Sequence, residues 1–104
     1  MGIEFYYWAD CPSHEEALAR LREVMAEQSI TDEIRLVEVV GDEEAARLQF
    51  PGSPTIRVDG VDIDPAGAAQ MIHGLTCRVY TRPDGRITPL PPRELIAAAL
   101  RRGG

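Results

Sequence analysis

The sequence predicts an α/β fold in a single domain. Short runs of β-branched and aromatic residues alternate with segments of helical periodicity, and an Asp-Gly pair joins two of those runs. Alternation of this kind is typical of a sheet packed against helices. The chain has 104 residues, enough for one packed core but not for two. We therefore expect one α/β domain, residues 1–104, with one functional site.

The first part of the chain predicts a strand, a helix and a second strand. Residues 3–8 are apolar or aromatic apart from Glu4, which is typical of a strand covered on both faces. Pro12 then stands where a helix tolerates proline, and apolar side chains recur at three- and four-residue spacing, which predicts a helix over residues 12–27. The β-branched content of residues 34–40 predicts the second strand.

A short helix and a hairpin are expected next. Acidic residues after Gly41 are favourable in the first turn of a helix. A Pro-Gly-Ser-Pro cluster at residues 51–54 ends this helix. Two β-prone runs, residues 55–58 and 61–63, flank Asp59-Gly60, which is a strong signal for a two-residue hairpin turn. The predicted order to this point is βαβαββ.

The remaining residues predict a helix, a strand and a C-terminal helix. Asp64-Pro65 starts a helix that extends through Ile72 and ends at Gly74. Residues 77–81 alternate like a strand and precede a Pro-Asp-Gly turn. Residues 93–102 follow two prolines, precede a glycine and carry apolar side chains on one face, which predicts an amphipathic helix.

The composition excludes several classes of function. The formal net charge is −6 and basic residues form no cluster beyond Arg101-Arg102, so we expect no nucleic-acid partner. No apolar run approaches the length that spans a bilayer, and the N-terminus lacks the basic start of a secretion signal. We therefore expect a cytoplasmic protein that binds no membrane. The residues leave the oligomeric state open.

The candidate site is a thiol at the junction of the first strand and the first helix. Cys11 is followed by Pro12, Ser13 and His14. Unpaired N–H groups and the dipole at a helix N-terminus favour an anion, so they favour the thiolate that performs nucleophilic or metal chemistry. We expect the Cys11 sulfur to be open to solvent. A neutral His14 imidazole would be able to hydrogen-bond this thiolate, or else His14 is an ordinary residue of the first turn.

The order of elements and three short motifs resemble the thioredoxin-like fold, most closely its glutaredoxin branch. In that family a Cys-Pro-x-Cys motif begins the first helix, a cis proline precedes the third strand, and an Asn-Gly or Asp-Gly turn follows that strand. The matching residues here are Cys11-Pro12-Ser13-His14, Ser53-Pro54-Thr55 and Asp59-Gly60. The match covers residues 3–63 and the last helix. It implies a βαβαββα sandwich with a central mixed sheet, helices on both faces and an insertion at residues 65–90.

The resemblance implies thiol–disulfide exchange through Cys11 with a thiol- or disulfide-bearing protein or a small thiol, and it allows glutathione as a cofactor. It also implies that the partner binds at Pro12, Ser13, Ser53, Pro54 and Thr55. The chain departs from the family where His14 replaces the second cysteine, so the local resolving thiol is missing. Whether the protein is an enzyme is therefore left open.

Three interpretations follow from this departure. In the first, a mixed disulfide on Cys11 is resolved by an external thiol or by Cys77. In the second, Cys11, His14 and Cys77 bind a soft metal ion, or an iron–sulfur cluster together with glutathione. In the third, the fold has lost redox chemistry and is a binding scaffold that docks partners at the Cys11 edge.

The position of Cys77 depends on how the chain leaves the predicted hairpin. The two cysteines are 66 positions apart. If the chain leaves at the end of the sheet that holds Pro54, Cys77 is able to fold back onto Cys11. If Cys77 instead begins a longer strand from the opposite end, the two Cα atoms lie beyond the distance of about 7 Å that a disulfide requires. The sequence leaves both arrangements open, and a purely structural role for Cys77 as well.

Overall fold

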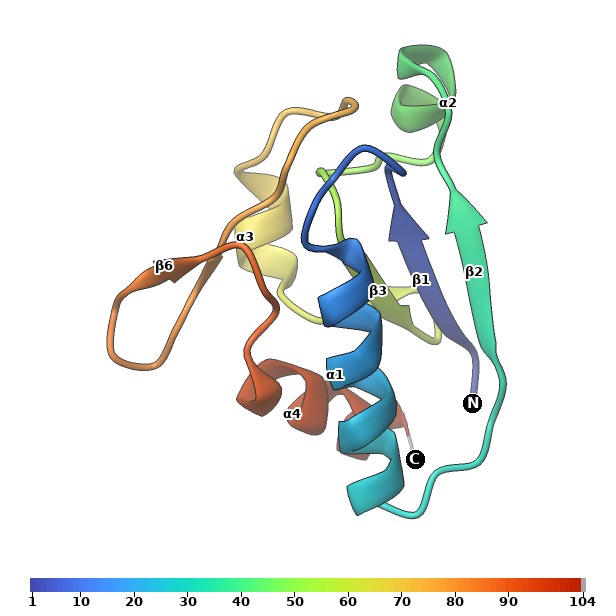
Figure 1. Ribbon diagram of the computed structural model, residues 1–104, viewed down its shortest axis with the longest axis vertical. Coiled ribbons are helices and arrows are strands. Elements are labelled where there is room, and N and C mark those ends of the chain that lie inside the picture. Colours follow the sequence, from blue (N-terminus) through green and yellow to red (C-terminus); the bar gives the residue numbers. More distant parts are fainter. Residues whose placement is uncertain (104) are drawn as a thin grey trace.

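A mixed sheet of four strands forms the centre of the fold in the computed structural model, which describes residues 1–103 (Figure 1). The strands are β1 (Ile3–Tyr7), β2 (Ile34–Glu38), β3 (Thr55–Val58) and β4 (Val61–Asp62). Their order across the sheet is β2-β1-β3-β4. β1 pairs in parallel with β2 and antiparallel with β3, and β4 pairs antiparallel with β3.

The side chains of β1 alternate between the two faces of the sheet, and each face carries its own apolar cluster. Ile3 and Phe5 lie opposite Val58 and Ile56 of β3 and pack in one cluster with two helices, α1 (His14–Glu27) and α4 (Arg93–Gly103). Tyr6 belongs to the second cluster, which includes the helix α2 (Asp42–Arg47) and consists of Tyr6, Val39, Ala45 and Phe50. The sheet therefore has helices on both faces, and the predicted order βαβαββ is confirmed.

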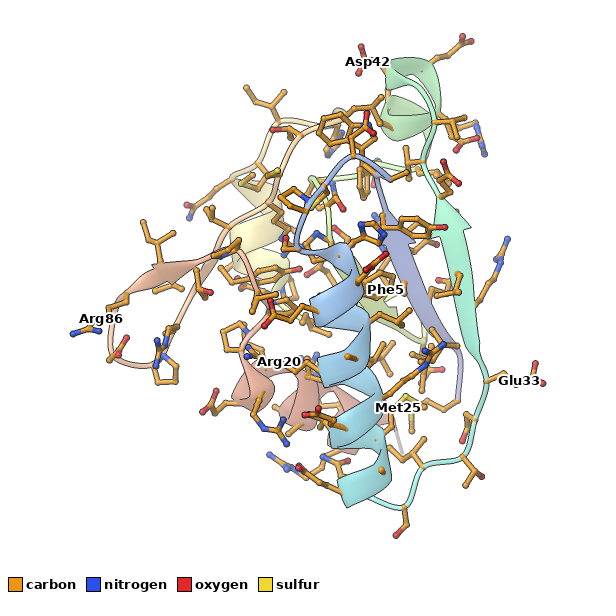
Figure 2. The ribbon with its side chains drawn as sticks, in the orientation of Figure 1. Phe5, Arg20, Met25, Glu33, Asp42 and Arg86 are labelled. Atoms are coloured by element: carbon orange, nitrogen blue, oxygen red, sulfur yellow. The ribbon has the colours of Figure 1, made fainter. Side chains whose placement is uncertain are left out.

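The helices α1 and α4 pack against each other over the larger cluster. The buried residues of α1 recur at three- and four-residue spacing, as expected for an amphipathic helix: Ala17, Leu21, Val24 and Met25. Figure 2 shows Phe5 and Met25 between α1 and the sheet, whereas Glu33 and Arg86 project outward. Burying a large apolar side chain contributes about 1.5–3 kcal/mol, so this interface is a main source of the stability of the fold. No helix within residues 1–103 combines the length and the apolar character that crossing a membrane requires.

Residues 65–90 differ most from the prediction. The helix α3 (Pro65–Ala69) is shorter than expected because none of its residues is buried, and burial of an apolar face is what normally stabilises a helix. The strand expected over residues 77–81 is regular only in β5 (Tyr80–Thr81), which pairs with β6 (Ile87–Thr88) across the predicted turn. Cys77 lies ahead of β5 and takes part in an isolated parallel β-bridge with Ser53. This bridge brings the segment to the end of β1 where the candidate site lies.

Candidate thiol site

Cys11 lies in the turn that connects β1 to α1. Its N–H donates to the carbonyl oxygen of Trp8 at 2.9 Å, which folds the chain back over the end of β1. The helix begins at His14, two residues later than predicted, because Pro12 and Ser13 form a turn. Ser13 is the N-cap residue, but its hydroxyl makes no capping hydrogen bond and instead lies 3.3 Å from the Cys11 sulfur. The sulfur therefore faces the start of the helix.

The loop before β3 contacts the same sulfur. The Ser53–Pro54 peptide bond is cis, as the family resemblance implies. The Trp8 N–H donates to the Ser53 hydroxyl at 3.0 Å, and the Cys11 thiol donates to the Ser53 carbonyl oxygen at 3.5 Å. Two loops that are about forty residues apart in the sequence are thus joined at one thiol.

A third segment reaches the site through the backbone of Ser53. The Ser53 N–H donates to the carbonyl oxygen of Thr76, and the Arg78 N–H donates to the carbonyl oxygen of Ser53, both at 2.8 Å. These two bonds form the parallel bridge and place the intervening Cys77 beside Ser53, where its thiol interacts with that of Cys11. The first of the two arrangements that the sequence left open is the one observed.

Gly52 permits this close approach of two backbones. Its φ is +118°, a conformation that residues with a Cβ rarely adopt. A Cβ at this position would lie 3.1 Å from Cβ and 3.2 Å from the amide nitrogen of Arg78. A side chain on residue 52 would therefore push the Cys77 segment away from the sheet.

The guanidinium of Arg78 fixes the segment from the other side. Its side chain is 1% exposed and donates to the Asp62 carboxylate at 2.7 and 2.8 Å, and further to Thr55 Oγ1 and the Asp64 carbonyl oxygen. It also lies over the ring of Tyr80, whose hydroxyl donates to the Pro54 carbonyl oxygen at 2.6 Å. Sequence analysis missed Arg78, because an arginine in an alternating run gives no sign that it will be buried.

The two thiols are affected in opposite directions. Burial raises the pKa of the Cys11 thiol, but hydrogen bonds from Ser13, Ser53 and Cys77 outweigh this effect and bring the pKa below its ordinary value. The pKa of the Cys77 thiol is raised by burial, by the negative charge of a Cys11 thiolate and by the hydrogen bond between the two thiols. Of the two thiols, Cys11 therefore has the lower pKa and forms the first thiolate.

The expectation that the Cys11 sulfur is open to solvent is wrong. Cys11 is 1% exposed, whereas Cys77 is an exposed residue. The cause is the segment from Thr76 to Arg78, which lies over Ser53 beside the Cys11 thiol. Of the two sulfur atoms, the one on Cys77 is the one that solvent and partners can reach.

The loop residues expected to bind a partner are used within the chain instead. Ser53, Pro54 and Thr55 are buried, and both backbone groups of Ser53 are bonded to the Cys77 segment. The Thr55 hydroxyl donates to the Gly52 carbonyl oxygen at 2.6 Å. Pro12 is exposed, and Ser13 is half-buried with its hydroxyl on the Cys11 sulfur. Of the predicted partner surface, only Pro12 and part of Ser13 are therefore accessible.

His14 is held away from the sulfur atoms. Its Nδ1 lies 2.7 Å from the carbonyl oxygen of Cys11, and its ring stacks on Tyr7 with the ring centres 4.9 Å apart. The geometry thus gives His14 a place in the packing of the turn. In the part of the chain that the structure describes, no three His, Cys, Asp or Glu side chains are close enough together to hold a metal ion, so Cys11, His14 and Cys77 do not form the ligand set considered above.

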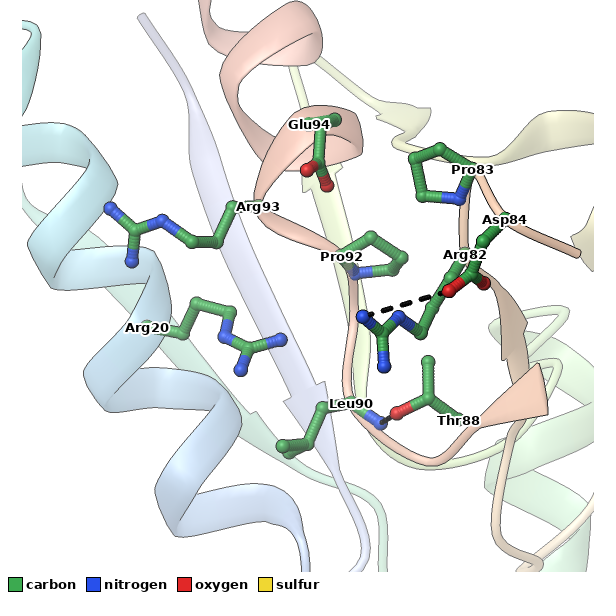
Figure 3. Close-up of a pocket in the computed structure, with 9 residues that line it drawn as sticks. All are labelled: Arg20, Arg82, Pro83, Asp84, Thr88, Leu90, Pro92, Arg93 and Glu94. Carbon is green, nitrogen blue, oxygen red and sulfur yellow. Dashed lines mark hydrogen bonds and ion pairs between the residues drawn. The ribbon is translucent and has the colours of Figure 1, made fainter. Parts of the chain in front are cut away.

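A separate cavity of about 480 Å³ lies between α1, the β5–β6 hairpin and the start of α4 (Figure 3). Its basic side chains have partners within the fold. Arg93 extends toward α1 and binds Glu23 and Glu27, and Arg20 donates to the carbonyl oxygen of Pro91. We therefore base the functional argument on the thiols rather than on this cavity.

Comparison with known proteins identifies no relative for this chain: no family model, no curated protein and no solved structure matches it significantly. The function is therefore inferred from the chemistry of the site. The feature that any function must account for is the pair of thiols that two distant segments bring together beside Ser53.

Proposed function

We propose that this chain is a thioredoxin-like thiol–disulfide exchange protein whose redox couple is Cys11 and Cys77. The observation that carries the proposal is the parallel bridge between Ser53 and Cys77, which sets the second thiol against the first. The order of the elements and the position of the Ser53 loop beside Cys11 support the fold assignment. Cys77 then takes the part of the cysteine that His14 replaces in the local motif.

The couple exchanges two electrons and two protons. When Cys11 and Cys77 form a disulfide, both thiols lose their protons and an external disulfide is reduced to two thiols. In the reverse direction two external thiols are oxidised and the protein returns to the dithiol form. The partner is a thiol- or disulfide-bearing protein or a small thiol, and we propose the cytoplasm as the compartment, where such thiols are abundant.

The different acidities of the two thiols support this chemistry. Exchange requires a thiolate, and hydrogen bonding at the site, foremost by the Ser13 hydroxyl 3.3 Å from the sulfur, brings the pKa of Cys11 below its ordinary value.

Peptide mapping after oxidation tests the couple. The reduced protein is incubated with oxidised glutathione, alkylated and digested with trypsin, which separates Cys11 in residues 1–20 from Cys77 in residues 58–78. We expect these two peptides to be joined by a disulfide, and the protein to pass its disulfide on to dithiothreitol.

Two single variants serve as matched controls. Cys11→Ser and Cys77→Ser should each abolish the linked peptide and the transfer of a disulfide to dithiothreitol, with little loss of stability because serine is close in size to cysteine. The remaining single thiol can still form a mixed disulfide. Full alkylation of both cysteines after oxidation, or full activity in Cys11→Ser, would refute the proposed function.

A further inference from the structure

We propose that external thiols enter the site at Cys77: the partner thiolate attacks the Cys77 sulfur of the Cys11–Cys77 disulfide, and Cys11 is the leaving group. This inference rests on the proposed function and assigns the two cysteines their order of action. The cysteine of the Cys-Pro motif is thereby the internal thiol of the couple, and the cysteine contributed by residues 65–90 is the one that partners meet.

Access to the two sulfur atoms is the first argument. Exchange needs the attacking sulfur to approach a disulfide sulfur directly. Cys11 is 1% exposed, whereas Cys77 is exposed, as are Thr76 before it and Val79 shortly after it. An incoming thiolate therefore meets Cys77 first.

The anchoring of the covering segment is the second argument. Attack on the Cys11 sulfur would require residues 76–78 to move away from Ser53 in the loop before β3. That movement would break both backbone bonds to Ser53 and would pull out the Arg78 guanidinium, which is bonded to Asp62, Thr55 and the Asp64 backbone. Attack at Cys77 requires none of these bonds to break, so it is the route that the native packing permits.

The stability of the leaving group is the third argument. A disulfide breaks more readily when the departing sulfur is the better thiolate. The Ser13 hydroxyl, 3.3 Å from the Cys11 sulfur, stabilises the departing Cys11 thiolate, whose pKa is lowered, whereas the pKa of Cys77 is raised. The site is therefore arranged to accept electrons from thiols, that is, to oxidise them.

The complete reaction consists of two displacements. The partner thiolate forms a mixed disulfide with Cys77, and the electron pair of the broken S–S bond leaves on Cys11. A second thiolate, on the same partner or another molecule, then attacks the partner's sulfur in the mixed disulfide. The Cys77 sulfur leaves with the electron pair and takes up a proton from water. One disulfide is then formed, within the partner or between two partner molecules, and the protein holds the Cys77 thiol and the Cys11 thiolate.

Single-cysteine variants measure access directly. Cys11→Ser leaves only Cys77, and Cys77→Ser leaves only Cys11 under an unchanged cover. Each reduced variant is treated with oxidised glutathione, and the rate is divided by the thiolate fraction found by titrating the same variant, because the pKa values of the two thiols differ. We expect Cys77 to form the mixed disulfide at least about tenfold faster than Cys11, because Cys77 is an exposed residue whereas Cys11 is 1% exposed. An equal or faster rate for Cys11 would overturn the entry order.

Oxidised wild-type protein locates the attack itself. It is mixed with reduced glutathione, quenched with acid within a short time, alkylated and mapped. We expect the glutathione adduct on residues 58–78 rather than on residues 1–20. An adduct on Cys11 would overturn this inference alone, since exchange would still occur, whereas failure of the wild type to form the internal disulfide would overturn the proposed function and the inference together. Cys11→Ala provides a second single-cysteine variant should Cys11→Ser fold poorly.

Discussion

Removing the charge of Asp62 tests how the Cys77 segment is held in place. In Asp62→Asn the side chain keeps its size, but the Arg78 guanidinium loses its counter-charge while remaining 1% exposed. Removing one partner of a buried ion pair lowers the free energy of unfolding by about 3–5 kcal/mol. We expect about 3 kcal/mol here, because Thr55, the Asp64 carbonyl oxygen and the Tyr80 ring still contact the Arg78 guanidinium. A loss of this size is a large part of the total stability of about 5–15 kcal/mol of a small domain.

The two partners of this ion pair are not equivalent. Arg78→Met leaves the Asp62 carboxylate, which is 10% exposed and lies on the edge strand β4, where water can hydrate it. We therefore expect Arg78→Met to destabilise the fold less than Asp62→Asn does. The double variant Asp62→Leu with Arg78→Met removes both charges and should be more stable than the sum of the single effects predicts.

Urea unfolding measures these differences as changes in the free energy of unfolding. Arg35→Met is the matched control, since it removes an arginine from an exposed ion pair with Glu4 and should cost less than about 1 kcal/mol. In Asp62→Asn, Cys11 should also react faster with a thiol reagent, because the segment that covers it is loosened. An Asp62→Asn effect as small as that of Arg35→Met, with Cys11 still protected, would refute this account.

Three further outcomes are expected. In the reduced wild type, the first thiolate absorbance should appear below the ordinary thiol pKa of about 8.5 and should be absent from Cys11→Ser. The stability that this thiolate contributes is complete above that pH and is lost as the pH falls through the folded-state pKa, and an unshifted titration would contradict the assignment. Gly52→Ala should cost about 1–3 kcal/mol in urea unfolding and should reduce the yield of the Cys11–Cys77 disulfide. The reason is that the φ of +118° disfavours alanine and the added Cβ would lie too close to the Arg78 backbone. Wild-type stability in this variant would argue against this packing. Tyr80→Phe should cost about 1–3 kcal/mol, since it leaves the buried Pro54 carbonyl without its donor, and a neutral effect would show that the bond is dispensable.

The parts of the fold that the sequence predicted well are those in which one short segment contains the whole signal. The periodicity of α1 and the Asp59-Gly60 turn both lie within a few residues, and both are observed. The helix α3 was predicted too long, because its capping residue Asp64 is visible in the sequence but the lack of a buried face is not. Local patterns specify where an element starts better than how far packing will extend it.

The thiol site could be predicted only in part for the same reason. The Cys11 motif and the proline at residue 54 are local signals, and both lie at the site. The burial of Cys11 was missed because the segment that covers it comes from a distant part of the chain. The position of that segment depends on the ion pair between Arg78 and Asp62. An ion pair between two distant residues leaves no periodic pattern in the sequence.

Because the second thiol comes from a distant segment, the redox couple depends on the packing of residues 74–81 as well as on the two cysteines. A motif with both cysteines in one helical turn would keep its thiols together as long as that turn persists. Here the thiols stay together only while Arg78 remains bonded to Asp62 and the Ser53 bridge is intact. Cys77 itself is exposed, but Tyr80 of the same segment belongs to the main apolar cluster around Phe5 and α1. The segment can therefore open only together with part of that cluster, so we expect the couple to be lost with the fold rather than before it.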